Sequence, residues 1–101
     1  MKAAAPTWQT LEDTVPKDVF RAEVESWAKR IGVKPKEVHI RPMTKKWGSC
    51  STSGRVSFNA ELLAKPANLR KEVIVEELLH LKIGNHGKLF KAMKKAYLEQ
   101  P

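Results

Sequence analysis

Apolar residues recur every three or four positions in three stretches of the chain, which cover residues 14–31, 66–83 and 87–99. This is the spacing of an amphipathic helix, whose apolar side chains gather on one face. A proline stands near the start of the first two stretches, and Gly32 and Gly84 follow their ends, as is typical of helix boundaries. The pattern therefore predicts three helices.

Between the first two helices the chain changes to the shorter period of β-strands. Residues 38–43 alternate and contain a proline, which suggests an edge strand. Residues 46–51 and 55–59 flank a Thr-Ser-Gly turn, which predicts a hairpin, whereas residues 60–64 fit neither period. The expected fold class is α+β, with an N-terminal helix, a small three-stranded twisted sheet, a helix that carries the candidate active site, and a C-terminal helix.

A chain of 101 residues is long enough for one small domain. We expect residues 1–101 to form a single minimal domain, in which residues 1–13 are a loose arm or dock through Trp8 and Leu11. Cys50 is the one cysteine, which excludes an internal disulfide and fits a reducing compartment. No apolar run approaches the roughly 20 residues that span a bilayer, and the start is too weakly apolar for a signal peptide. We therefore expect a cytoplasmic protein with no membrane partner.

The second predicted helix carries the candidate chemistry. On a helical wheel, Glu76, His80 and Glu77 fall within a wedge of about 100°, and apolar residues cover most of the remaining circumference. The helix is therefore predicted to be largely buried, with one polar wedge. Residues four apart lie one above the other, so Glu76 and His80 can face one ion, and the break at Gly84 lets His86 return toward them.

Two histidines and one carboxylate are a known ligand set for catalytic zinc, and Glu77 beside them could take a proton from water. A plainer interpretation stands next to this one. Glu76 and His80 could form an ordinary i,i+4 pair worth a few tenths of a kcal/mol, and His86 could belong to a simple loop. The residues of this helix alone leave both open.

A wider set of residues resembles a known family. The chain contains Trp47-Gly48-Ser49-Cys50, Asn59, Val75-Glu76-Glu77-Leu78-Leu79-His80-Leu81, Asn85-His86 and Phe90. In this order they resemble the YgjP-like metallopeptidases and the small minigluzincins of the gluzincin type, over about half the chain. The resemblance implies an active-site helix packed under a small sheet, His80 and His86 as zinc ligands, and Glu77 as the general base.

Glu76 departs from the family pattern, because the family has its first ligand histidine at this place. Glu76 could bind the zinc directly and complete a set with His80 and His86, although its charge would make the metal a poorer Lewis acid. Alternatively, Glu76 turns aside, and two ligands remain, too few for tight zinc binding. One Zn²⁺, weak or absent in the second case, is the implied cofactor.

The resemblance also implies that an edge strand beside the active-site helix pairs with the substrate backbone. The candidate substrate-binding residues are Ser57, Phe58, Asn59 and Ala60. We further expect Trp47 to lie in the core. As a hypothesis, the segment 97–101 covers the cleft or exchanges with a neighbouring molecule, which would give self-association.

Charge adds one more candidate function. The chain has 19 Lys and Arg against 11 Asp and Glu, a net charge of +8, with a dense basic run at Lys88, Lys91, Lys94 and Lys95. We interpret this run as a solvated face, since no nucleic-acid-binding motif accompanies it. The first choice is a zinc metalloendopeptidase that hydrolyses a peptide or protein substrate by metal-activated water. The alternatives are a catalytically impaired or latent relative that acts as a binding or regulatory module, and a basic nucleic-acid-binding domain.

Overall fold

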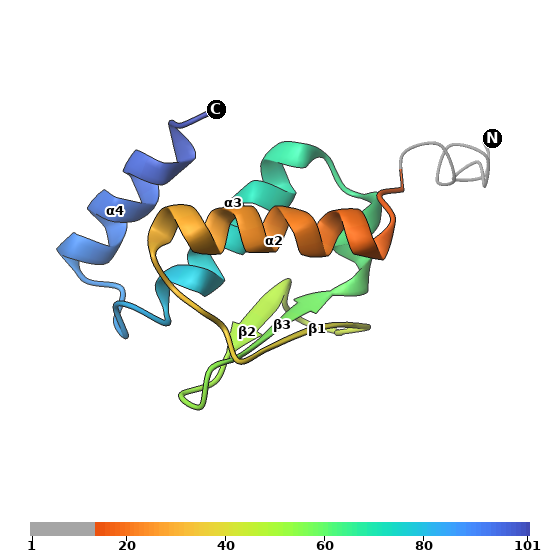
Figure 1. Cartoon of the computed structure of the whole chain (residues 1–101), viewed down its shortest axis with the longest axis horizontal. Helices are drawn as coiled ribbons and strands as arrows, with labels where there is room; N and C mark the ends of the chain where they lie inside the picture. The colour runs from red at the N-terminus through yellow and green to blue at the C-terminus, as the bar shows by residue number, and fades with distance from the viewer. Residues whose placement is uncertain (1–13) are drawn as a thin grey trace.

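The computed structural model describes residues 14–101, so the expected arm at residues 1–13 lies outside the described residues (Figure 1). The described chain has the expected α+β fold, with three α-helices, a three-stranded mixed sheet and one 3₁₀ helix. In chain order the elements are α2 (Lys17–Ile31), β1 (Glu37–Arg41), β2 (Gly48–Cys50), β3 (Arg55–Asn59), η1 (Ala60–Ala64), α3 (Ala67–Leu79) and α4 (Lys88–Leu98). The ambiguous residues 60–64 form the 3₁₀ helix.

Helix boundaries follow the local sequence at most ends. Gly32 ends α2 with a φ of 84°, a left-handed conformation that glycine adopts without strain. The expected end of α3 near Ile83 is wrong, because the α-helix ends at Leu79. From there the chain continues in tighter turns, in which the amides of Leu81 and Lys82 bond carbonyls three residues back. This tightening turns the chain away from the helix axis, before the glycine is reached.

The sheet has the strand order β1-β3-β2, so the last strand in the chain is the central one. β2 and β3 form the predicted antiparallel hairpin, whose turn contains Gly54 with a φ of 99°. β1 runs parallel to β3, from Glu37 beside Arg55 to Arg41 beside Asn59. β1 and β2 are therefore the two edges of the sheet.

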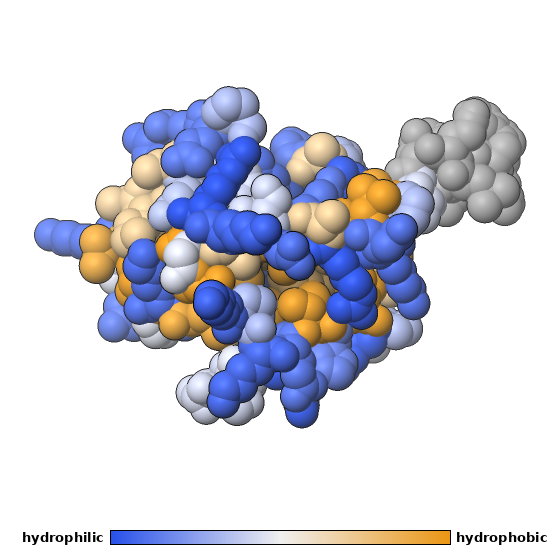
Figure 2. All heavy atoms as spheres, in the orientation of Figure 1, coloured by the Kyte–Doolittle hydropathy of each residue, from blue (hydrophilic) through white to orange (hydrophobic). Residues whose placement is uncertain are grey.

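The hydrophobic core lies between the sheet and two helices. α2 and α3 stack over the same side of the sheet, and α4 stands at one end of the molecule (Figure 1). Phe20 of α2 meets Phe58 of β3 edge to face, with ring centroids 5.3 Å apart, and Leu78 and Leu79 of α3 are fully buried. Hydrophilic residues cover most of the face that carries α2, and apolar side chains emerge between this helix and the sheet (Figure 2).

Two polar side chains tie these layers together. Arg70 of α3 forms two hydrogen bonds to the carboxylate of Glu23 on α2, at 3.1 and 3.0 Å, and a third to the carbonyl of Lys65. The buried Asn59 donates to the carbonyls of Met43 and Lys46 and accepts from the amide of Glu61. Within residues 14–101, no helix is long and apolar enough to cross a membrane.

Candidate metal centre and cleft

Three side chains that could hold a metal come together at the end of α3. Glu76 lies in the last turn of the helix, His80 caps its C-terminus, and His86 returns from the loop before α4. One donor atom from each of the three lies within 4.8 Å of the others. The Nε2 atoms of His80 and His86 are 2.9 Å apart. The structure thus brings together the three residues that the sequence predicts as candidate ligands.

An aromatic ring of α4 fixes the two histidines. Phe90 is buried and stacks on His86, with ring centroids 4.4 Å apart, and its centroid lies 4.9 Å from that of His80. The two imidazoles are themselves stacked at 4.7 Å. The loop residue His86 is exposed, and its contacts with the buried ring of Phe90 and with His80 hold its imidazole toward α3.

The electrostatics of His80 suit a metal ligand. Burial lowers the pKa of His80 below its ordinary value, and the neighbouring His86 lowers it further, while Glu76 acts in the opposite direction. The lowered pKa favours the neutral imidazole at pH 7. A neutral imidazole is the form that binds a transition metal.

The donor set fits a tetrahedral divalent ion such as zinc. Two nitrogens bound at about 2.0–2.1 Å with tetrahedral angles lie about 3.3 Å apart. The observed Nε2 separation of 2.9 Å differs from this by a few tenths of an ångström, which small rotations of the rings can supply. The carboxylate completes the set of two histidines and one acid known from catalytic zinc sites.

Glu76 is already paired with a cation of the chain itself. The ammonium of Lys94, on α4, lies 2.6 Å from Glu76 Oε1 and 3.4 Å from Glu72 Oε2. Burial lowers the pKa of Lys94, but the hydrogen bonds and charges of Glu76 and Glu72 outweigh burial and hold the pKa above its ordinary value of 10.5. Lys94 is therefore a fixed positive charge beside the candidate metal ligands.

Glu77 is the buried carboxyl of the site, with 8% of its surface exposed. Burial raises the pKa of Glu77 to about 7, and the charge of Glu76 adds to the rise, while Lys46 and Lys94 act against it. Such a group both holds and releases a proton near neutral pH, as a general acid and base must. The role of general base, which the family resemblance implies for Glu77, stays a prediction.

Gly48 makes room for this carboxyl. A Cβ atom at Gly48 would lie 2.9 Å from Cγ of Glu77 and 3.1 Å from the carbonyl oxygen of Ser57. Both contacts are closer than atoms normally approach, so any other residue would displace β2 or Glu77. Glycine at this place lets the backbone of β2 pass directly over the candidate catalytic residue.

Two hollows meet at Gly48 and Glu77. One, of about 460 Å³, extends along Glu72 and Glu76 and is bordered by Trp47. The other, of about 440 Å³, extends past His80. Together they form a groove between α3 and β2, which is lined by Glu76, Glu77 and His80. Trp47 is 37% exposed at the rim of this groove, so the expectation that it lies in the core is wrong.

The premise of an open edge at β3 is also wrong. β3 pairs with β1 on one side and with β2 on the other, so its backbone has no free edge for a substrate. The side chains of Ser57, Phe58 and Asn59 are buried in the sheet, and Ala60 begins the 3₁₀ helix. Asn59 in particular is a structural residue, because its side chain fixes the loop that leads into β2.

The edge that borders the groove belongs to β2. The carbonyl of Trp47 and the amide of Ser51 bond to β3. Because backbone direction alternates along a strand, the N–H and C=O groups of Gly48 and Cys50 point to the opposite, outer edge. These two residues also line the groove.

The C-terminal segment lies elsewhere. Arg30 donates to the carbonyl of Pro101, and Lys71 donates to the carbonyls of Leu98 and Gln100. No residue of the segment 97–101 lines either hollow of the groove, so the segment does not cover the cleft in this structure. Exchange with a neighbouring molecule stays a prediction.

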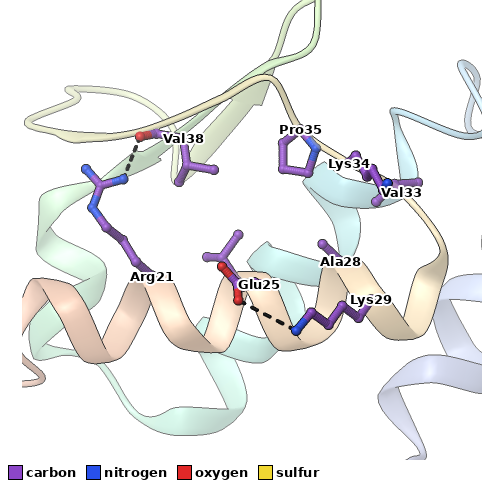
Figure 3. Close-up of a pocket in the computed structure, with 9 residues that line it drawn as sticks. Arg21, Glu25, Ala28, Lys29, Val33, Lys34, Pro35 and Val38 are labelled. Atoms are coloured by element: carbon purple, nitrogen blue, oxygen red, sulfur yellow. Dashed lines mark hydrogen bonds and ion pairs between the residues drawn. The ribbon is translucent and has the colours of Figure 1, made fainter.

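A separate hollow lies between α2 and β1 (Figure 3). It has a volume of about 310 Å³, and its walls include Ala28, Val33, Pro35 and Val38. Arg21 closes part of it by donating to the carbonyl of Val38 at 2.8 Å. Its lining holds no histidine, cysteine or hydroxyl group.

Sequence reasoning did not find the roles of Gly48, Phe90 and Lys94. The first two belong to the family pattern, but the pattern does not say what they contact. Lys94 was predicted to lie on a solvated lysine face, whereas it reaches back to α3. A signal was present, because Phe90 and Lys94 are four residues apart and so share one face of α4.

Two histidines and two carboxyls, gathered at the C-terminal end of α3 beside a small sheet, are the arrangement of a metallopeptidase-like domain. The chain belongs to the YgjP-like metallopeptidase domain family, whose sequence pattern matches residues 4–101. No curated protein matches the chain.

Solved structures show the same fold. The metallopeptidase zymogen jannalysin of Methanocaldococcus jannaschii is similar with a TM-score of 0.70 and 24% identity, over 77% of this chain and 80% of that one. The metallopeptidase zymogen abylysin of Pyrococcus abyssi is similar with a TM-score of 0.67 and 20% identity, over 75% of this chain and 76% of that one. These likenesses confirm the expected minigluzincin-like architecture.

Proposed function

We propose that the protein is a zinc-dependent peptidase, in which Glu76, His80 and His86 hold one metal ion. The proposal is supported by the convergence of the three donor atoms within 4.8 Å and by membership of a metallopeptidase family. A zinc ion held by two histidines and a carboxylate supplies a Lewis acid that polarises a carbonyl and makes water more acidic. The residues around it supply the remaining functions.

Glu77 acts first as the general base and then as the general acid. Its carboxylate accepts a proton from the attacking water, and the same carboxyl then donates that proton to the amine that leaves. A pKa of about 7 suits both steps, because a group that titrates near the working pH can take and return a proton at similar cost. Burial under Gly48 keeps this carboxyl out of bulk water.

β2 binds the substrate backbone. An extended peptide that pairs with the outer edge of β2 would meet the N–H and C=O groups of Gly48 and Cys50, as in the common mode of strand addition. Such a peptide would lie along the groove, directly over Glu77. This assignment replaces the role first expected for β3.

The groove is the observation on which the proposal rests. Within residues 14–101 it combines an outer strand edge that pairs with no other strand, a carboxyl with a pKa of about 7, and part of a metal donor set. The test begins with the metal content of the purified protein. Zinc-loaded protein is then incubated with a mixed peptide library, and products are identified by mass spectrometry. Glu77→Gln should abolish cleavage while it keeps the metal, and Glu76→His should raise both zinc affinity and cleavage.

Two outcomes would reject the proposal. Zinc binding that does not depend on His80 would place the metal elsewhere. Cleavage that survives Glu77→Gln would show that a contaminating peptidase or another group performs the reaction.

A non-catalytic relative is the second candidate, and one observation favours it. The ion pair between Lys94 and Glu76 already satisfies the carboxylate without a metal. In that case the purified protein contains no zinc and the groove binds peptides without cleaving them, which equilibrium dialysis of a labelled peptide would detect.

A further inference from the structure

The position of the family's first ligand histidine is occupied here by an ion pair. The ammonium of Lys94 lies 2.6 Å from Oε1 of Glu76, and it is 3.4 Å from Oε2 of Glu72. The side chain of Lys94 is 21% exposed and that of Glu76 is 33% exposed. This is a short, partly desolvated contact, and water screens it less than it screens a surface pair.

We infer that Lys94 is an internal counter-ion that competes with a divalent metal for Glu76 and thereby sets the metal affinity of the site. The inference rests on the proposed function, because it assumes that Glu76 is one of the three ligands. A metal on the carboxylate would lie within a few ångströms of the ammonium that the same carboxylate now binds. Two cations at that distance repel each other strongly in a partly buried site.

The ion pair of Glu76 and Lys94 can be compared by formal charge with the histidine that the family has at position 76. A neutral histidine contributes no charge to a metal site, whereas Glu76 contributes −1. Lys94 brings the sum of these two side chains to zero, and Glu72, 3.4 Å from the same ammonium, leaves the three together at −1. The formal charge of the ligand and its partner together is thus the same as that of a histidine, although the ammonium must share the carboxylate or leave it when a metal enters.

Other lysines of α4 do not share this role. Lys95 is the next residue in the chain and is exposed, and it forms no ion pair with Glu76 or Glu72. Loss of its charge alters the net charge of the protein by the same amount as loss of Lys94. Lys95→Met is therefore a matched control for Lys94→Met.

The experiment measures zinc affinity of the full chain, stripped of metal and titrated in competition with a chromogenic chelator. Loss of a group that orients a metal ligand commonly lowers metal affinity 10–100-fold. Because the group here is a cation, its removal should raise affinity. We expect Lys94→Met to bind zinc about tenfold more tightly than the wild type, and Lys95→Met to differ from it by less than about twofold.

A double-mutant cycle separates the charge effect from a general structural one. In a Glu76→Gln background there is no carboxylate to release and only the repulsion between the ammonium and the metal remains, so Lys94→Met should give a smaller gain in affinity than in the wild type. Lys94→Arg keeps the charge and should stay close to the wild type. If Lys94→Met does not fold, Lys94→Gln keeps a hydrogen-bond donor without the charge and should show the same gain.

The possible results distinguish failure of this inference from failure of the proposed function. If His80→Ala weakens zinc binding but Lys94→Met and Lys94→Gln leave it unchanged or weaker, the inference is wrong and the metal site stands. An equal gain in zinc affinity in the Glu76→Gln background also overturns the inference, because the effect of Lys94 then does not depend on the carboxylate of Glu76. If neither the wild type nor Lys94→Met binds zinc in a manner that depends on His80, the proposed function fails.

Discussion

Replacing the buried carboxyl of Glu77 by an amide should stabilise the metal-free protein at neutral and alkaline pH. The pKa of Glu77 is raised by burial to about 7, against an ordinary value of 4.5. Between about pH 4.5 and pH 7, the folded state therefore holds a proton that the unfolded state has already released. The contribution of Glu77 is fully present below pH 4.5 and is lost as the pH rises to 7.

The magnitude follows from the difference of about 2.5 pH units between the two pKa values. Each unit corresponds to about 1.36 kcal/mol, so the charged carboxylate costs about 3 kcal/mol of folding free energy above pH 7. Glutamine has nearly the same shape and does not ionise. Glu77→Gln should therefore be more stable than the wild type by up to about 3 kcal/mol at pH 8, and equally stable near pH 4.

Urea denaturation followed by circular dichroism, in the presence of a chelator, measures this difference at a series of pH values. Glu25→Gln is the control, because Glu25 is exposed and its pair with Lys29 is a surface one, which contributes at most about 1 kcal/mol. An advantage for Glu77→Gln that is the same at pH 5 and pH 8 would refute the reasoning. So would a variant that is less stable than the wild type at pH 8.

Three further substitutions test contacts around the groove. Gly48→Ala places a Cβ 2.9 Å from Cγ of Glu77 and should cost about 1–3 kcal/mol of unfolding free energy. An unchanged denaturation midpoint would show that β2 or Glu77 can shift without loss of stability. Asn59→Ala removes three partly buried hydrogen bonds to backbone groups and should cost up to about 3 kcal/mol. Asn59→Asp should restore only the bond from the amide of Glu61. Arg70→Met breaks the two-bond ion pair with Glu23 and should cost about 2 kcal/mol of unfolding free energy. If Arg70→Met costs the same amount in a Glu23→Gln background, the loss does not come from this ion pair.

The elements of the fold could largely be predicted from sequence, because periodicity reports which face of an element is buried. Phe20 and Val24 mark the inner face of α2, and the wheel of α3 correctly indicated a buried helix with one polar wedge. Periodicity does not report which strands are neighbours. The pairing of β1 with β3 therefore could not be predicted, although the four consecutive buried residues of β3 are typical of a central strand.

The candidate site could be predicted in part, because ligands on one helix have a fixed spacing. Glu76 and His80 were expected to face the same point, and the structure places them there with His86. The position of Lys94 could not be predicted, since it lies 18 residues from Glu76 and depends on how α4 packs. Its charge alone looked like part of a solvated surface.

The parallel pairing of β1 with β3 has a consequence for the order of folding. The β2–β3 hairpin closes through a short turn, and hairpins form within microseconds. β1 pairs with β3 across the whole of β2 and its flanking loops, so this parallel contact closes a longer loop than the hairpin does and costs more chain entropy. The strand that borders the groove should thus be in place before the opposite edge of the sheet, and substitutions in β1 should mainly accelerate unfolding rather than slow folding.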